Sequence, residues 1–231
     1  MGEEKQEFIS FFDEMNILKT EKRQRVKTAE AFYKAYSMFF EDIRKDLLSG
    51  RYDHEKRDGD YVDDLIAVYI GVIEKEMPEI AYDSSILNKA QQTANYIHNT
   101  TKSRIKIAGE HDVEFSSAVM FGTGLKEEQI PYDVEWAIDP NGWRVVEIAI
   151  NETQYVHNYA RHKEKTESQA THTWQTQKDE KVRGTHAAAD GQTKPINEPF
   201  IVGGYAMMFP GDTLTSNPPG DLTINCRCVE L

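Results

Sequence analysis

Two cysteines, Cys226 and Cys228, are the residues of this chain whose type and spacing most clearly suggest chemistry. They flank a single arginine close to the C-terminal end, and the sequence contains no other cysteine. This count excludes a scaffold held together by several disulfides. The pair can instead consist of two reduced thiols that behave as small apolar groups in a core.

A structural Zn²⁺ site is the second interpretation of the pair. Thiolate and imidazole are the ligands that Zn²⁺ prefers, so Cys226, Cys228 and His186 are the expected ligands, with His172 or Asp190 as candidates for the fourth position. A small module rich in loops would gain much of its folding free energy from such a metal. A third interpretation, a catalytic thiol with His186 as its base, has no accompanying oxyanion feature in the sequence.

A second set of residues has side chains that could take part in catalysis: Arg183, His186 and Asp190. The first two are one helical turn apart, so they would share one face of a helix. Together with Asp190 they are the residue types of a nuclease or transferase acting on nucleic acid, which is the alternative enzymatic function. The simpler interpretation, which we favour, makes Arg183 structural and pairs it with Glu152 or Asp179.

Positive charge gathers between residues 157 and 165. His157, Arg161, Lys163 and Lys165 lie at the far end of an expected helix. Such a run is usually a solvated face. It is also the place where we expect any DNA contact.

Composition narrows the function classes. The chain has 231 residues and a formal net charge of -12, which disfavours a protein whose whole surface binds nucleic acid. No stretch approaches the roughly 20 apolar residues of a membrane span, and the acidic N-terminus is unlike a signal peptide. We therefore expect no membrane partner.

The elements that carry these residues follow from hydrophobic spacing. Apolar residues alternate at three and four positions from Val26 to Leu47, which predicts a long helix that packs in its own bundle or onto a partner. A loop over residues 51–60, a helix over 61–77 and a third helix after Asp83 are expected next. Residues 102–142 indicate short helices and loops without an assignable motif.

From residue 143 the pattern changes from helix to strand. A long helix is predicted over 143–168, with Glu152 inside its apolar stripe. Strands are expected over 171–177, around Trp174, and over 223–229, and Gly203-Gly204 predicts a hairpin over 200–208. We therefore expect an α+β chain, with a mostly helical body over 1–142 and a module over 143–231 whose α+β unit spans 171–231.

The module's polar and aromatic residues occur in a specific order. They are Trp174, Asp179, Arg183, His186, Asp190-Gly191, Pro199-Phe200, Pro210-Gly211-Asp212 and Asn225-Cys226-Arg227-Cys228. This ordered set resembles the C-terminal domain of phage minor head proteins of the Mu F type, the head-morphogenesis family. The helix motif that precedes it in the family retains its glutamate here as Glu152, whereas Ile150 replaces its arginine.

The resemblance implies a virion component rather than an enzyme. Such proteins associate with the portal protein or the major capsid protein inside the procapsid, and they influence head assembly or DNA passage. The resemblance thus places the protein inside the phage head, assembled in the host cytoplasm. Some members look able to bind DNA.

Overall fold

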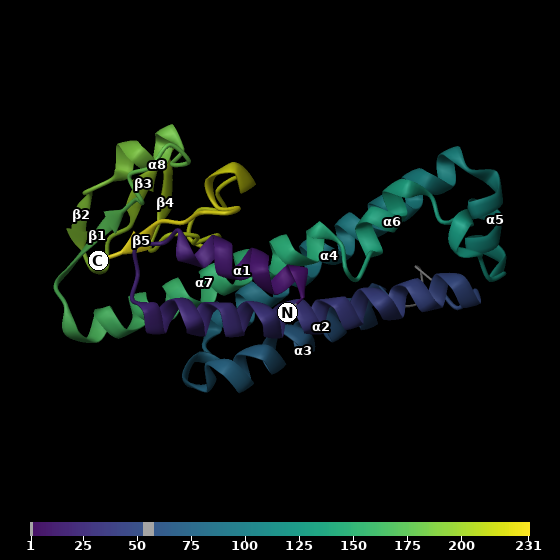
Figure 1. Ribbon diagram of the computed structural model, residues 1–231, viewed down its shortest axis with the longest axis horizontal. Helices are drawn as coiled ribbons and strands as arrows, with labels where there is room; N and C mark the ends of the chain where they lie inside the picture. The colour runs from purple at the N-terminus through teal and green to yellow at the C-terminus, as the bar shows by residue number, and fades with distance from the viewer. Residues whose placement is uncertain (1, 53–57) are drawn as a thin grey trace. The chain divides into compact units, whose positions relative to one another are not determined.

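The computed structural model describes residues 2–52 and 58–231 (Figure 1). The part of the expected loop that falls on residues 53–57 lies outside them. The helices are α1 (Glu3–Asp13), α2 (Lys19–Ser49), α3 (Asp58–Glu76), α4 (Ser84–His111), α5 (Val113–Phe121), α6 (Tyr132–Ile138), α7 (Trp143–Ser168) and α8 (Gly184–Ala189). The strands are β1 (Thr171–Gln175), β2 (Thr193–Pro195), β3 (Phe200–Val202), β4 (Tyr205–Met207) and β5 (Val229–Glu230). The chain is therefore α+β, as the sequence predicts.

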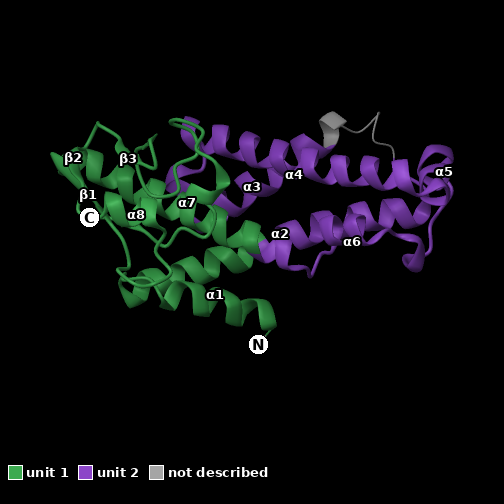
Figure 2. Cartoon of the chain, turned by 90° about the horizontal axis from the view of Figure 1, so that it is seen from above, with its two compact units in different colours: residues 1–32, 147–231 green, residues 33–146 purple. Residues whose placement is uncertain are grey.

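The chain divides into two compact units (Figure 2). One consists of residues 1–32 and 147–231, and the other of residues 33–146. This division differs from the expected boundary after residue 142, because the first 32 residues belong with the C-terminal module. The unit boundaries fall inside two long helices, because α2 and α7 each begin in one unit and continue into the other.

The unit of residues 33–146 is helical. The apolar seam of α2 is buried at Tyr36, Phe40, Ile43 and Leu47, so it packs inside the bundle, as one of the two interpretations of the heptad pattern proposed. The helix ends before Gly50, whose φ of 69° lies in the left-handed region that favours glycine. Residues 102–142 form more helix than expected, because α4 continues to His111 before α5 and α6 follow.

Two small antiparallel sheets lie in the unit of residues 1–32 and 147–231 (Figure 1). In the three-stranded sheet, β1 is central and pairs Thr173 with Thr193 of β2 and Trp174 with Glu230 of β5. The predicted hairpin is present as β3 and β4, which pair Val202 with Tyr205 around the Gly203-Gly204 turn.

The expected strand over 223–229 is wrong except at its end. Residues 223–225 form a turn, and only Val229–Glu230 pairs as β5. Asn225 has a φ of 54°, so the backbone bends just before Cys226 and cannot continue as a strand. The bend turns this segment into the module's core, which contains Trp174, Ala189, Phe200, Val202, Met207, Leu222, Cys226 and Cys228.

Candidate functional site

The structure brings His186 and both cysteines together. Nδ1 of His186 lies 3.3 Å from Sγ of Cys228 and 3.6 Å from Sγ of Cys226, and all three residues are buried. Both thiols face this one histidine on the core side of the segment. His186 reaches them from α8. The cysteines form no disulfide.

The two thiols differ in acidity. The pKa of Cys226 lies well below its ordinary value, because its sulfur accepts hydrogen bonds from the Cys228 thiol and from His186. The pKa of Cys228 is raised because its thiol donates to Cys226 and because it is buried. The site therefore favours one thiolate beside one thiol.

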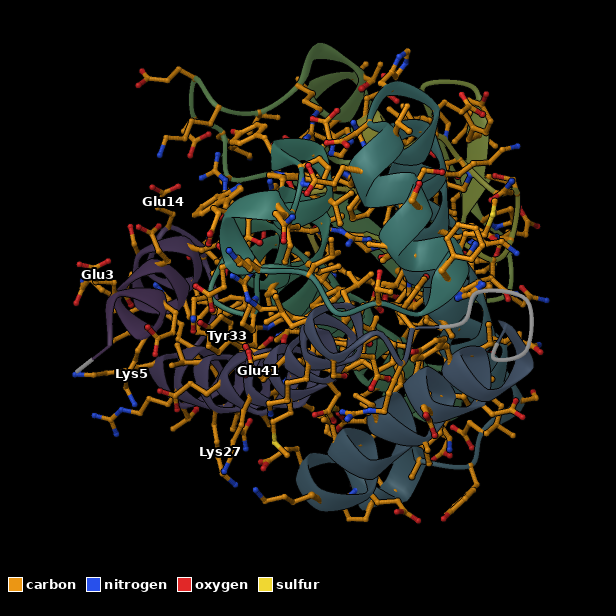
Figure 3. All side chains as sticks on the ribbon, turned by 90° about the vertical axis from the view of Figure 1, so that its right-hand side faces the viewer. Glu3, Lys5, Glu14, Lys27, Tyr33 and Glu41 are labelled. Carbon is orange, nitrogen blue, oxygen red and sulfur yellow. The ribbon has the colours of Figure 1, made fainter. Side chains whose placement is uncertain are left out.

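Arg227 points away from the cysteines and binds Asp179. Its Nη1 and Nη2 donate to the two carboxylate oxygens at 2.7 and 2.8 Å. This pair lowers the pKa of Asp179. Nη1 of Arg227 also lies 3.1 Å from Oε2 of Glu14, which follows α1 and is labelled in Figure 3.

Arg183 does not form the ion pair that the sequence predicts. Arg183 donates from Nη2 to the carbonyl oxygen of Ile224 at 2.6 Å, so it holds the turn before the cysteines. Asp179 is bound by Arg227 instead. Glu152 is buried on α7. Arg183 therefore contacts the main chain rather than either of the two expected carboxylates.

Two residues of α7 that the sequence did not single out also hold the turn. Oδ1 of Asn151 accepts a hydrogen bond from the main-chain N–H of Asn225 at 2.7 Å. Nε2 of Gln154 donates to the carbonyl of Cys226 at 2.6 Å. Asn151 directly precedes Glu152 and Gln154 follows it by two positions, so this part of α7 fixes the backbone that carries the cysteines.

Asp190 and Gly191 serve β1 rather than the cysteine cluster. Oδ1 of Asp190 accepts from the main-chain N–H and the hydroxyl of Thr176 at 2.8 and 3.0 Å, which lowers the pKa of Asp190. Gly191 donates to the carbonyl of Trp174 at 2.8 Å. Asp190 is thus committed elsewhere, and it does not converge with Arg183 and His186.

Two of the basic residues of α7, His157 and Arg161, contact the first part of α2. His157 lies 3.0 Å from the hydroxyl of Thr28, and burial together with Arg25 and Arg161 lowers its pKa well below the ordinary value. Arg161 forms an ion pair with Glu21 and also donates to the main-chain carbonyl of Glu230. Lys163 and Lys165 are half-buried, and burial lowers the pKa of Lys165. His157 is therefore neutral at physiological pH, and Arg161 is already paired.

Arg25 is a buried charge that the sequence pattern did not reveal. Its side chain is fully buried, and it donates to Gln154, to Oδ1 of Asn158 at 3.0 Å and to Oε1 of Glu21 at 2.8 Å. Burial lowers its pKa to about 10, so it stays protonated near neutral pH. Arg25 joins α2 to the same α7 segment that fixes the cysteine turn.

A second buried cluster lies on α7, β1 and β5. Oε1 of Glu230 is 3.0 Å from Nδ1 of His162 and 2.9 Å from Nδ1 of His172. Nε2 of His172 is 2.9 Å from the carbonyl oxygen of Glu198. His172 therefore does not complete the cysteine cluster, where we considered it as a fourth ligand. No pattern in the sequence indicates this arrangement.

The fold and these contacts describe a class of protein: a largely helical chain with a compact C-terminal module. The conspicuous polar residues of the module hold the module's turns in place. The family model described as "Phage Mu protein F like protein" matches residues 112–231, a little over half of the chain. The chain belongs to this family, which is a family of phage head proteins. Comparisons with curated proteins and with solved structures gave no match. No helix in residues 2–52 and 58–231 is long and apolar enough to cross a membrane.

Proposed function

We propose that this chain is a structural component of the phage head that binds the portal protein or the major capsid protein on the inside of the procapsid, and assists head assembly or DNA passage. The family match over residues 112–231 carries this proposal. The protein would assemble in the host cytoplasm and remain in the virion.

Binding rather than catalysis fits the site geometry. Arg183, His186 and Asp190 each have a separate structural partner, namely the Ile224 carbonyl, the Cys228 thiol and Thr176. A nuclease or transferase needs its acid, base and phosphate-binding groups to converge on one substrate position. The arrangement therefore favours a docking module over the enzymatic alternative. DNA contact through the basic part of α7 has less support, because His157 is neutral and Arg161 is paired.

The exposed apolar side of α5 is the surface that we assign to the head partner. Val113, Met120 and Phe121 are 82%, 73% and 74% exposed. Positions seven and eight residues apart lie on one side of a helix, so the three side chains share one side of α5. Exposed apolar patches of this kind mark protein interaction sites. The patch also lies within the residues that the family model matches.

Co-expression with the portal protein of the same phage tests this function. We expect the two proteins to co-elute in size-exclusion chromatography, and the double substitution Met120→Ser, Phe121→Ser to abolish co-elution without lowering the melting temperature. Lys126→Ser is the control, because this exposed residue lies just beyond the patch. Failure of the wild-type chain to co-elute with either the portal protein or the major capsid protein would overturn the proposal.

We also propose that His186, Cys226 and Cys228 bind a structural Zn²⁺. Tetrahedral Zn²⁺ with bonds of about 2.3 Å to sulfur and 2.0 Å to nitrogen separates neighbouring ligand atoms by roughly 3.5 Å. The observed separations of 3.3 and 3.6 Å match this value. The ion would replace the shared proton of the thiols and tie α8 to the C-terminal segment.

A small cavity beside the cluster leaves room for a fourth ligand. It has a volume of about 20 Å³ and is lined by the cysteines, His186, Arg183 and Asn225 among others. A cavity of roughly 10–15 Å³ is enough for one water molecule, so a water would fit as the fourth ligand of the ion. Elemental analysis of purified protein should find zinc, and chelation should lower the melting temperature. Cys226→Ser should abolish the thiolate charge-transfer band of the Co²⁺-substituted protein, whereas a wild type that lacks this band would end this proposal.

A further inference from the structure

We propose that His162, His172 and Glu230 form a second divalent metal site, separate from the cysteine cluster and selective for a transition metal such as Zn²⁺. The three ligand atoms all lie within 4.8 Å of one another. They come from α7, β1 and β5, and each residue is at most 7% exposed. Two imidazoles and one carboxylate are a ligand set that Zn²⁺ accepts.

The hydrogen bonding of His172 makes the case for a cation. A carbonyl oxygen can only accept, so Nε2 of His172 carries a proton that it donates to Glu198. In a neutral ring Nδ1 then presents a lone pair, and it faces an oxygen of Glu230 at 2.9 Å. Two lone pairs at this distance repel each other unless a positive charge lies between them.

The carboxylate of Glu230 presents one oxygen to both histidines. Both histidines address Oε1 of Glu230, whereas Oε2 is buried without a hydrogen-bond partner in the described chain. One oxygen and two Nδ1 atoms within 4.8 Å of one another can bind a single metal ion, with the carboxylate monodentate. Protons on both Nδ1 atoms would satisfy Oε1 as two hydrogen-bond donors, so metal binding by the purified protein is the measurement that distinguishes a bound ion from a protonated network.

The surroundings orient the ligands as metal sites do. Histidine ligands almost always donate their other ring N–H to a carbonyl or a carboxylate, and the Glu198 carbonyl has this role for His172. The ring of His172 also packs on Phe200, with centroids 4.0 Å apart, which restricts its rotation. Nitrogen and oxygen ligands favour Zn²⁺ and related ions, whereas Ca²⁺ and Mg²⁺ require oxygen ligands.

The bound ion would fasten the C-terminal strand. Glu230 belongs to β5, whose registered contacts are two residue pairs with β1. A metal that joins β5 to α7 would stabilise an element that is otherwise too short to be secure. Because the same strand follows Cys228, both proposed ions would hold the C-terminal segment, one on each side of Val229.

Cobalt replacement separates the two sites. The double substitution Cys226→Ser, Cys228→Ser removes the thiolate ligands, so this variant should bind one Co²⁺ that shows visible d–d bands without the near-ultraviolet thiolate charge-transfer band. Adding His172→Gln should abolish that binding. His111→Gln, at an exposed histidine, is the control and should change nothing.

The same question can be answered if the cysteine variant does not fold. His172→Gln or Glu230→Gln in the wild-type background should remove one equivalent of metal and weaken its binding by more than roughly tenfold, while the thiolate band stays. Unchanged stoichiometry in these folded variants would overturn the second site and identify the cluster as a proton-linked network. Loss of the thiolate band alone would bear only on the cysteine site.

Discussion

Arg227 donates two parallel hydrogen bonds to Asp179, at 2.7 and 2.8 Å, while the cysteines on either side of it face the core. Alternating side-chain directions explain how one short motif serves both purposes. The inward thiols meet His186, and the outward guanidinium holds the segment that precedes α8. The Cys-Arg-Cys motif therefore contributes two thiols to the buried cluster and one arginine to an ion pair at the surface.

The bidentate pair of Arg227 and Asp179 provides the first prediction, which is that stability depends on the shape of the guanidinium group at position 227. Arg227→Lys retains the charge but loses the fork that binds both oxygens, so it should lower the melting temperature nearly as much as Arg227→Gln. A double-mutant cycle with Asp179→Asn should give a coupling energy that decreases as salt increases, because Asp179 is exposed. Additive effects of the two substitutions would mean that the pair adds nothing to stability.

Local patterns in the sequence predicted much of this fold. The hairpin around Gly203-Gly204, the burial of Trp174 and the long helix at 143–168 depend on neighbouring residues, and the structure confirms them. The strand expected over 223–229 was wrong because Asn225 adopts a left-handed conformation that alternation does not reveal.

The polar contacts were not predictable in the same way. Gln154 reaches the carbonyl of Cys226 across 72 positions, and His162 reaches Glu230 across 68. Spacing rules report only which residues share a face of one element. The choice of partner depends on how α7 packs on β1 and β5, so residue types suggested the Cys-His cluster but not the His-His-Glu cluster.

Arg25 provides the second prediction. Arg25→Met removes a fully buried cation and leaves Gln154, Asn158 and Glu21 without their donor. Breaking a buried network on one side costs about 3 kcal/mol, and we expect that loss in the free energy of unfolding by urea. Arg23→Met is the matched control, since Arg23 is exposed on the same helix, and it should change stability by less than about 0.5 kcal/mol. Equal effects of the two substitutions would show that the buried hydrogen bonds of Arg25 do not stabilise the fold.

Gly191 provides the third prediction. Its φ of 76° lies in the left-handed region, and a Cβ at this position would meet no atom within 4 Å. Gly191→Ala should therefore cost only backbone strain, about 1 kcal/mol in the free energy of unfolding. Gly184 also has open space around its Cβ position but lies at the start of α8 with no positive φ. Gly184→Ala should be neutral or stabilising, and a similar loss in both variants would contradict this account.

His157 provides the last prediction, which concerns pH. Burial and the neighbouring Arg25 and Arg161 depress its pKa in the folded protein, whereas the unfolded chain has a pKa near the ordinary value of 6.5. Below that value the unfolded state binds a proton that the folded state does not accept, so stability falls as pH decreases.

Comparing variants separates the decrease in stability due to His157 from the decreases due to the other histidines. Between pH 7.5 and 5.5 the His157 contribution to the free energy of unfolding should decrease by about 1 kcal/mol. His157→Gln, which retains a polar group beside Thr28, should show that much less pH dependence than the wild type. His111→Gln, at an exposed position, should titrate like the wild type. A wild type and a His157→Gln variant with the same pH profile would show that His157 is accessible and protonated, which would restore it as a candidate for DNA contact.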